Sequence, residues 1–268
     1  MRENGQLFSD DEIALRAENL TKTFRLSAKQ KKREKTQAKT KLAVNGLSFT
    51  VKKGEIYGLL GPNGAGKTTT LRILSTLIKP DSGDAYINGY SVTKNAEKVR
   101  ENIGFLTSEL KPDEFFTPSY LFDFFANLHG MNEQKRNERK QMLFERFGIN
   151  RFSETKISEL STGMKQKVSI AISLVHDPDF IIFDEPTNGL DVLTAKTVTD
   201  FLMEMKNNGK TVLLSTHIFS LVEKICDRAG IIIDGKMAEE GEVKTLTKEK
   251  NLEEVFFDLY ASIKGEER

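Results

Sequence analysis

Cysteine, long apolar runs and net charge are what this sequence has least of, and each shortage excludes a class of protein. The one cysteine, Cys226, cannot form an internal disulfide framework, and the absence of a CxxC pair argues against structural zinc. No apolar run approaches the ~18 residues that a membrane span needs, and the first residues, MRENGQLFSDDE, are unlike a secretory signal. We therefore expect a chain of a reducing, cytoplasmic compartment.

Charge is nearly balanced over the whole sequence. The 268 residues include 40 Lys and Arg against 39 Asp and Glu, which gives a net charge of +1 at pH 7. A field that is basic over the whole chain, of the kind that grips nucleic acid, is excluded, and no nucleic-acid partner is expected. Hydrophobic residues at 38% and charged residues at 29% are typical of a globular protein. The length allows one large domain or two small ones.

The local exception to this balance is a basic insertion at residues 28–41. It holds seven basic residues against the single acid Glu34, and it has no apolar periodicity. This pattern predicts a solvated loop or the extension of a hairpin. Each Lys or Arg near an anionic bilayer gains about 1 kcal/mol, so contact of Lys29–Lys41 with anionic lipid is an alternative role. Contact with an acidic partner surface is another.

Strand-like and helix-like segments alternate along most of the chain, which favours an α/β fold on a mainly parallel sheet. The middle, about residues 108–160, changes to a Phe-rich helical pattern, and the tail at 242–268 is also charged and helical in pattern. The predicted strands lie at 12–24, 41–51, 56–60, 85–87, 103–106, 179–185, 211–217 and 229–236, the last closing the sheet, and predicted helices lie at 68–77, 132–147, 163–176 and 193–208.

The strongest motif is GPNGAGKTT, which matches the pattern GxxxxGK[ST] of a phosphate-binding loop between an apolar strand and a helical segment. Its glycines let successive backbone N–H groups point at a phosphate chain, and the helix start adds partial positive charge. Lys67 is the cation for the β and γ phosphates, and Thr68 is a ligand for Mg²⁺. The motif predicts that a nucleoside triphosphate is bound by Gly61, Pro62, Asn63, Gly64, Ala65, Gly66, Lys67, Thr68 and Thr69.

Two carboxylates follow a second apolar strand in IIFDEP. The strand would place Asp184 and Glu185 at the carboxyl end of the sheet, where ligands of α/β proteins bind. Asp184 is predicted to hold Mg²⁺ through water, and Glu185 to polarise the attacking water as a catalytic base. A third segment, LSTGMKQK, reads by itself as a helix N-cap, in which Ser161 or Thr162 satisfies free N–H groups.

The order of these motifs resembles that of the ATPase subunits of ATP-binding-cassette (ABC) transporters over residues 12–241. The resemblance implies the P-loop ABC fold, with a mainly parallel core sheet, an antiparallel β subdomain and a helical insertion. It also implies that Ser161, Thr162 and Gly163 contact the ATP held by a second copy, in an ATP-dependent homodimer around two MgATP. Thr162 replaces the family's second glycine and Met164-Lys165 its usual glutamine, and hydrolysis is expected to survive these changes.

Three further positions match the family. The resemblance implies that Asp191 in NGLDV communicates with the opposite site, that His217 in LLSTH is a catalytic residue on the γ-phosphate, and that Phe24 stacks on adenine. One expected residue is missing, because the family places a glutamine that contacts Mg²⁺ after the strand at 103–106. This chain has Thr107-Ser108-Glu109 there, so Ser108 and Glu109 are both candidates for the metal contact.

The family also implies a partner and a location. A transmembrane permease subunit on a separate chain is expected, with the ATPase peripheral on the cytoplasmic face of the cell membrane. The aromatic run FFTPSYLFDFF is predicted to pack the helical insertion, and part of it is an alternative groove for the permease.

The cargo is implied only by finer resemblance. The segments IGFLTSE, STGMKQK and NLEEVFFDLY are similar to those of bacterial sodium-extruding (Nat-type) ATPases, which implies sodium efflux. Exporters of drugs, peptides or lipids share much of this pattern and remain alternatives. A soluble ABC protein of translation or repair is a further alternative, disfavoured because one cassette, no coiled coil and no zinc cysteines are found.

Overall fold

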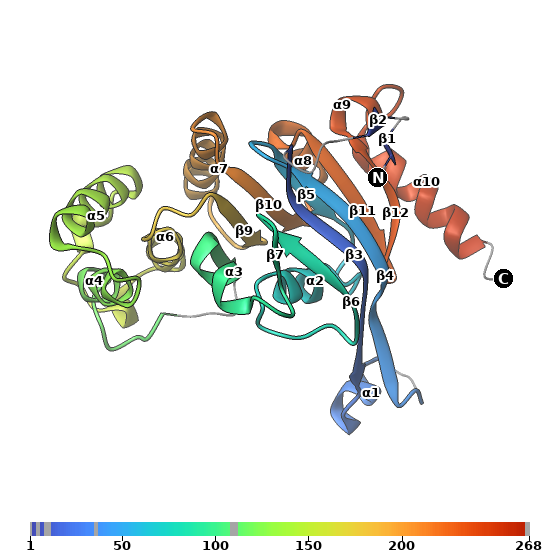
Figure 1. The fold of residues 1–268 in the computed structure, drawn as a ribbon, viewed down its shortest axis with the longest axis horizontal. Helices are drawn as coiled ribbons and strands as arrows, with labels where there is room; N and C mark the ends of the chain where they lie inside the picture. Colours follow the sequence, from blue (N-terminus) through green and yellow to red (C-terminus); the bar gives the residue numbers. More distant parts are fainter. Residues whose placement is uncertain (1, 4–5, 8–11, 35–36, 108–111, 266–268) are drawn as a thin grey trace.

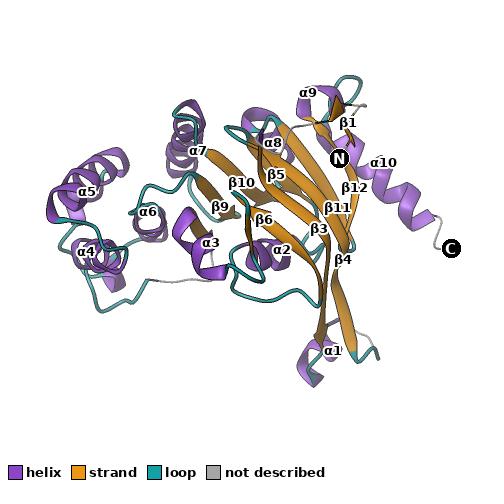
Figure 2. Cartoon of the chain, viewed as in Figure 1, coloured by secondary structure: helices purple, strands orange, loops and turns teal. Residues whose placement is uncertain are grey.

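The computed structural model describes residues 2–3, 6–7, 12–34, 37–107 and 112–265. Helices α4 (Pro118–Leu128) and α5 (Glu133–Phe147) lie at one end of the molecule, and α10 (Leu252–Gly265) lies at the other (Figure 1). Figure 2 shows the strands gathered between these two ends. In the part of the chain that is described, no helix has the length and apolar character that a membrane span requires.

The centre of the fold is a six-stranded sheet in the order β12-β11-β5-β10-β9-β8. All neighbouring strands are parallel except β12, which runs antiparallel to β11. Four of the parallel strands are buried along their whole length, as expected for a sheet covered on both faces. The strands are β5 (Ile56–Leu60), β8 (Ile103–Thr107), β9 (Phe180–Asp184), β10 (Thr211–Thr216), β11 (Arg228–Ile233) and β12 (Lys236–Glu242).

The carboxyl ends of four parallel strands meet at one edge of this sheet. Leu60 of β5 is level with Thr216 of β10, and Ser215 of β10 is level with Asp184 of β9. Thr107, the last residue of β8, is also level with Asp184. Polar residues that follow these strands in sequence are therefore brought together in space.

A second, antiparallel sheet has the order β4-β3-β6-β7. Its long strands β3 and β4 form a hairpin that extends beyond the main body and carries α1 (Ala28–Glu34) at its tip (Figure 1). Its strands are β3 (Ile13–Arg25), β4 (Thr40–Lys52), β6 (Ser82–Ile87) and β7 (Tyr90–Ser91), and β1 (Arg2–Glu3) and β2 (Gln6–Leu7) form a separate pair.

Helix α2 (Lys67–Leu74) lies between the two sheets. Its residues Leu71, Ile73 and Leu74 share one buried apolar cluster with Leu59 of β5 and Phe49 of β4. This packing fixes the start of α2 against both sheets, and that start is the end of the phosphate loop.

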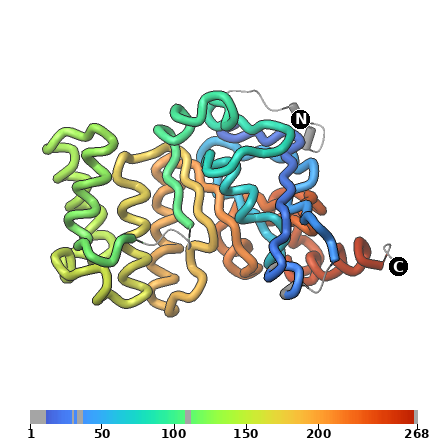
Figure 3. The backbone as a smooth tube through the Cα atoms, turned by 90° about the horizontal axis from the view of Figure 1, so that it is seen from below, coloured from blue at the N-terminus to red at the C-terminus, as the bar shows by residue number. Residues whose placement is uncertain are grey.

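The opposite face of the six-stranded sheet is covered by a larger apolar cluster, to which α4, α5 and the tail helix α10 also contribute. The view of Figure 3 again separates α4 and α5 from the β3–β4 hairpin. The remaining helices are α3 (Ala96–Asn102), α6 (Thr162–Ser173), α7 (Val192–Asn207), α8 (Phe219–Ile225) and α9 (Val243–Leu246), with short 3₁₀ turns at Ile149–Phe152 and Ile157–Glu159.

Several elements differ from the expectations, among them the basic insertion, the last strand of the sheet and α2. The basic insertion was predicted to be a solvated loop or the extension of a hairpin. It is a hairpin extension, and its tip forms the helix α1. The segment 229–236 does not close the sheet, because β12 adds one more strand outside β11. Helix α2 ends at Leu74 instead of residue 77, since Thr76 adopts a left-handed φ of 62° and the N–H of Leu77 bonds back to Arg72 O at 2.9 Å.

Candidate nucleotide-binding site

The phosphate loop connects β5 to α2, and two of its glycines are required by close backbone contacts. Gly66 has a φ of 106°, and a Cβ there would lie 2.3 Å from the carbonyl oxygen of Ala43. A Cβ on Gly61 would lie 2.3 Å from the carbonyl oxygen of Ile232. Any larger residue at either position would push the loop away from its supporting strands. The two glycines of the GxxxxGK[ST] pattern are therefore required for steric reasons.

Lys67 folds back over this loop. Its ammonium donates to the carbonyl oxygens of Gly61 at 2.7 Å and Pro62 at 3.3 Å, and it lies 3.5 Å from Oε1 of Glu185. Burial lowers the pKa of Lys67, and the charge of Glu185 opposes that shift. The cation is thus held inside the curve of the loop, where a phosphate chain would meet it.

Asp184 is a buried carboxylate that accepts hydrogen bonds from hydroxyls of three different elements. Thr68 Oγ1 donates to it at 3.1 Å, Thr107 Oγ1 at 3.5 Å, and Ser215 Oγ at short range. Carboxylate and hydroxyl oxygens are the ligands that Mg²⁺ prefers, so Thr68 and Asp184 fit a magnesium ion bound beside phosphate. The hydroxyls of Thr107 and Ser215 fix the orientation of the carboxylate.

Glu185 is held between two basic side chains. His217 Nδ1 lies 3.0 Å from Glu185 Oε1, the same oxygen that faces Lys67. The other oxygen, Oε2, is buried and has no hydrogen-bond partner among the described residues. The backbone of Glu185 has a φ of 52°, a left-handed conformation that is costly for a residue other than glycine and recurs at functional sites. One carboxylate oxygen is therefore anchored while the other remains available.

A cleft of about 260 Å³ joins these groups to the ends of β3 and β4 that lead into the hairpin tip. Phe24, which stands at the hairpin side, is 37% exposed and so is not a core residue. Leu26, Lys41 and Ala43 also line the cleft, and the sequence motifs did not single them out. The full lining is Phe24, Leu26, Lys41, Ala43, Asn63, Gly64, Gly66, Lys67, Thr68, Thr69 and Glu185.

The segment Ser161–Gly163 opens α6 and does not line this cleft. Ser161 is the N-cap, since its Oγ accepts a hydrogen bond from the N–H of Met164 at 3.3 Å. Thr162 is the first residue of the helix. The cap role expected from the sequence is therefore confirmed for Ser161, and within one chain the segment stands apart from the phosphate loop.

Asp191 is the N-cap of α7 and lies beside Gly163. Its Oδ1 accepts hydrogen bonds from the N–H groups of Leu193 and Thr194, each at 3.0 Å. Hydrogen bonds from the side chain and backbone of Thr194 hold the pKa of Asp191 below its usual value. The next residues, Val192 and Leu193, are 84% and 78% exposed, which leaves an apolar patch next to the start of α6.

Comparison with known proteins bears on this arrangement. A family model described as ABC transporter matches residues 44–188. The ABC transporter ATP-binding protein NatA of Bacillus subtilis (strain 168) is 36% identical over 214 residues, which cover 80% of this chain and 87% of that protein. The chain belongs to the ABC transporter family.

Other relatives agree with this assignment. The Nod factor export ATP-binding protein I of Burkholderia lata is 40% identical over 201 residues, covering 75% of this chain and 66% of that protein. A dimeric ATP-binding cassette in a post-hydrolysis state, bound to ADP and Pi, matches with a TM-score of 0.75 at 26% identity, covering 85% and 98% of the two chains. The chain is an ATP-binding subunit of an ABC transporter and an ATPase, and its fold is that of ABC cassettes.

Ser108 and Glu109, the two candidates for the missing glutamine, lie outside the described residues. Thr107, which precedes them, is buried at the end of β8 and contacts Asp184.

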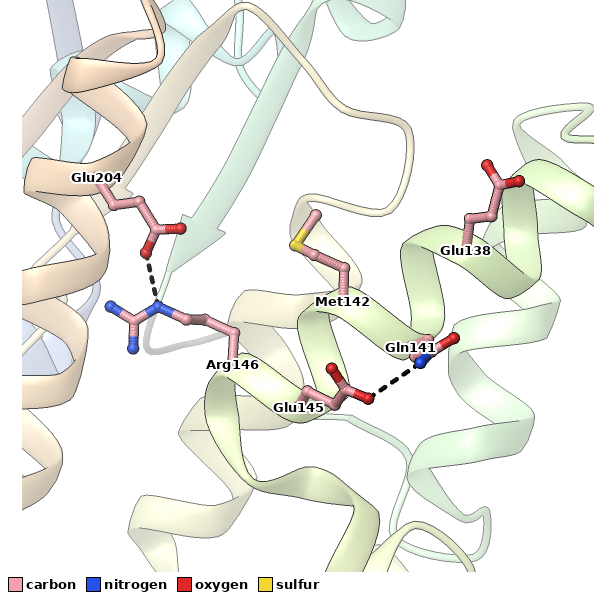
Figure 4. A pocket seen from close by; sticks show the side chains of 6 residues that line it. All are labelled: Glu138, Gln141, Met142, Glu145, Arg146 and Glu204. Atoms are coloured by element: carbon pink, nitrogen blue, oxygen red, sulfur yellow. Dashed lines mark hydrogen bonds and ion pairs between the residues drawn. The ribbon is translucent and has the colours of Figure 1, made fainter.

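A second hollow, of about 580 Å³, lies between α5 and α7 of the ABC ATPase (Figure 4). Arg146 donates to Glu204 across it at 2.7 Å, and Gln141 donates to Glu145 at 3.1 Å on its rim. None of the motif residues reaches it. Its lining consists of Glu138, Gln141, Met142, Glu145, Arg146 and Glu204.

Proposed function

We propose that this ABC ATPase hydrolyses ATP in a homodimer and drives a separate transmembrane permease subunit in export. The observation that carries the proposal is that the predicted ATP-binding motifs lie in two separate places in one chain. The phosphate loop and Glu185 line one cleft, and Asp184 and His217 bond directly to Thr68 and Glu185 of that lining, whereas Ser161–Gly163 opens α6 outside the lining. A second copy can supply the missing segment, so two cassettes facing each other would form two complete sites.

Each cleft would bind one ATP. Phe24 stacks on the adenine, and Lys67 with the N–H groups of residues 61–69 binds the β and γ phosphates. Thr68 and Asp184 hold Mg²⁺, which when bound neutralises phosphate charge. Glu185 Oε2 accepts a proton from the attacking water, because Oε1 is already engaged by its two basic neighbours.

His217 has two tasks in this proposal. Its Nδ1–H donates to Glu185 Oε1 and so fixes the carboxylate, and in the doubly protonated ring its Nε2–H would donate to an oxygen of the γ-phosphate. The imidazole follows β10 directly, so its position depends on the same sheet edge that carries Glu185. The base and the histidine therefore act as a unit.

The surface around the start of α6 would face the second copy. Ser161 and Gly163 reach the γ-phosphate of the partner's ATP, and Asp191 holds the first turn of α7 beside them. The exposed side chains Val192 and Leu193 lose water contact when the copies close. Closure needs ATP, since its phosphates carry the charge that both chains neutralise.

The permease would dock on the aromatic side of α4. Phe122 packs inside the helical region, but Tyr120 and Phe124 are exposed and stack with Phe116 in a ladder with ring centroids 4.5 and 6.4 Å apart. An exposed aromatic row on a helix is typical of a protein-binding surface. We place the ATPase peripherally, on the cytoplasmic face of the cell membrane.

We propose that the exported cargo is the sodium ion, because NatA is among the relatives, at 36% identity. Relatives at similar identity are named for Nod factor export and for multidrug transport, so export of drugs, peptides or lipids is the alternative. A soluble role in translation or repair is supported by none of these names. Sodium flux in vesicles that carry both subunits decides the cargo: ATP-driven sodium movement supports our proposal, and its absence overturns it.

The substitution Glu185→Gln tests the hydrolytic mechanism. The variant should bind MgATP but lose turnover by about two orders of magnitude or more, because the amide cannot accept the proton. It should also accumulate as an ATP-bound dimer in size-exclusion chromatography. Glu253→Gln, an exposed change in α10, is the matched control and should behave as wild type. A Glu185→Gln chain that hydrolyses normally, or stays monomeric with MgATP, contradicts the proposal.

The trapped variant also tests the partner. Tagged Glu185→Gln protein, added to detergent-solubilised native membranes with MgATP, should recover a multi-span membrane protein identifiable by mass spectrometry. The double change Tyr120→Ser and Phe124→Ser should abolish that recovery without affecting ATP binding. Recovery of ribosomes or repair proteins instead would favour the soluble alternative.

A further inference from the structure

Lys41 stands at the boundary between the basic hairpin and the nucleotide cleft. It is the second residue of β4, and in the antiparallel pair of β3 and β4 it lies directly opposite Phe24. Residues that face each other in such a pair point to the same side of the sheet, with Cβ atoms about 4.5–5.5 Å apart. The side chain of Lys41 therefore leaves the hairpin beside the ring that we propose stacks on adenine.

From there the side chain reaches the phosphate loop. The ammonium nitrogen of Lys41 lies 3.9 Å from the point where a Cβ on Gly64 would stand, and both residues line the cleft. Gly64 has a φ of 86°, and together with Asn63 it lines the cleft. Lys41 thus spans the distance between the adenine side and the phosphate side of the cleft.

Among the described residues, Lys67 and Lys22 are cations near the phosphate loop and the Phe24 ring, and each of them faces a different group. Lys67 lies inside the loop, on Gly61 O and beside Glu185, so it serves the terminal phosphates. Lys22 passes near the Phe24 ring, 5.8 Å from its centroid, and pairs with Asp81 at 2.8 Å. Neither of them covers the outer side of the loop, where Lys41 stands.

We propose that Lys41 is a nucleotide-binding residue, a second cation that contacts the phosphate chain of ATP from the hairpin side. The inference rests on the ATP site proposed above and adds to it a residue outside the phosphate loop. Its ammonium would form a charge-assisted hydrogen bond to a phosphate oxygen, the strong class of hydrogen bond. Lys41, the last residue of the basic insertion, would then bind the nucleotide, independently of what the rest of the insertion contacts.

The experiment is equilibrium binding of a non-hydrolysable MgATP analogue, measured by calorimetry. Lys41→Met keeps the aliphatic stem and removes the charge, and it should weaken binding about tenfold. Lys41→Arg keeps the charge and should stay within about twofold of wild type. The matched control is Lys39→Met, which removes the same charge from an exposed position two residues away and should leave affinity unchanged.

Lys67→Ala separates failure of this inference from failure of the site. Normal binding by Lys41→Met, with binding lost in Lys67→Ala, overturns the role of Lys41 and leaves the ATP site standing. If Lys41→Met and Lys39→Met weaken analogue binding equally, the proposal is also overturned. Such a result would come from the loss of a positive charge at long range and not from the loss of a direct contact. Normal binding by Lys67→Ala overturns the site itself and the inference with it.

Discussion

His176 is a histidine whose protonation the fold opposes. Its ring stacks on His129 with centroids 3.9 Å apart, and its Nε2 lies 3.0 Å from the carbonyl oxygen of Ile103. A carbonyl only accepts, so Nε2 carries the hydrogen of a neutral ring. Burial, then the neighbouring His129, lowers the pKa of His176 to about 4, while the bond to Ile103 opposes the shift. The stacked pair joins the end of α4 to the start of β8.

This shift makes stability depend on pH. The unfolded chain takes up a proton at His176 near pH 6.5, but the folded chain does so only near its pKa of about 4. The unfolded state therefore binds more protons between these values, and the free energy of unfolding falls as the pH drops. We expect a loss of about 2 kcal/mol between pH 7 and pH 5, measured by urea unfolding.

His176→Gln is the variant for this prediction. It should flatten the fall in stability between pH 7 and pH 5, since glutamine has no proton to take up. Parallel pH profiles for wild type and His176→Gln would show that the stacked pair is not the cause.

At the same scale, the sequence predicted some site residues and missed others for a physical reason. Gly61, Lys67 and Glu185 belong to motifs in which neighbouring residues meet because they are adjacent in the chain or follow parallel strands. Lys41 lines the cleft only because of the pairing register across the basic insertion. The contact of Thr107 with Asp184 depends on the order β8-β9-β10, which the order of strands in the sequence does not reveal.

At the scale of elements, the strands and long helices were predictable because apolar periodicity marks them. The exceptions lack that signal. Helix α1 is almost wholly polar, and β12, with the sequence KMAEEGE, is an edge strand with little apolar character. The end of α2 depends on Thr76 in a conformation that glycine usually supplies, so no glycine marks it.

The hairpin tip is the element whose removal is most informative. Replacing residues 27–38 with Asn-Gly would close β3 and β4 by a tight turn beyond Leu26, whose N–H bonds to Lys39 O at 2.9 Å. Phe24 and Lys41 would remain paired. ATP hydrolysis should therefore persist, while binding to anionic vesicles weakens because α1 and its lysines are gone.

Sedimentation with anionic and with neutral vesicles measures the effect of this replacement. Wild type should sediment with anionic vesicles only, and more weakly at high salt, because exposed charges are screened. If the shortened chain sediments as well as wild type, the insertion has no lipid role and the acidic partner surface becomes the better explanation.

At the scale of the whole molecule, the two parts of the proposed site belong to different regions. The phosphate loop is supported by α2 and the two sheets, whereas Ser161 begins α6, which packs with α4 and α5 in the other apolar cluster. The chain cannot bring both onto one nucleotide without a large rearrangement of its core. The symmetric pair that we propose would bring them together with no change in either fold.

That geometry predicts complementation between two inactive chains. Lys67→Ala disables the phosphate loop, and Ser161→Asp adds a negative charge facing the partner's phosphate while keeping a residue that caps helices well. Each chain alone should be nearly inactive. In an equal mixture, half of the dimers contain one of each chain, and each of these has one intact site, so activity should recover to roughly a quarter of wild type.

Ser161→Asn provides the control for that mixture, since it matches aspartate in size and caps equally well but has no charge. By itself it should retain ATP-dependent association, which shows that charge and not bulk disables Ser161→Asp. Recovery in the mixture should also rise with protein concentration, because only dimers contribute. Activity that stays at the sum of the two separate chains at every concentration would mean that each chain completes its own site, and the dimer mechanism would have to be abandoned.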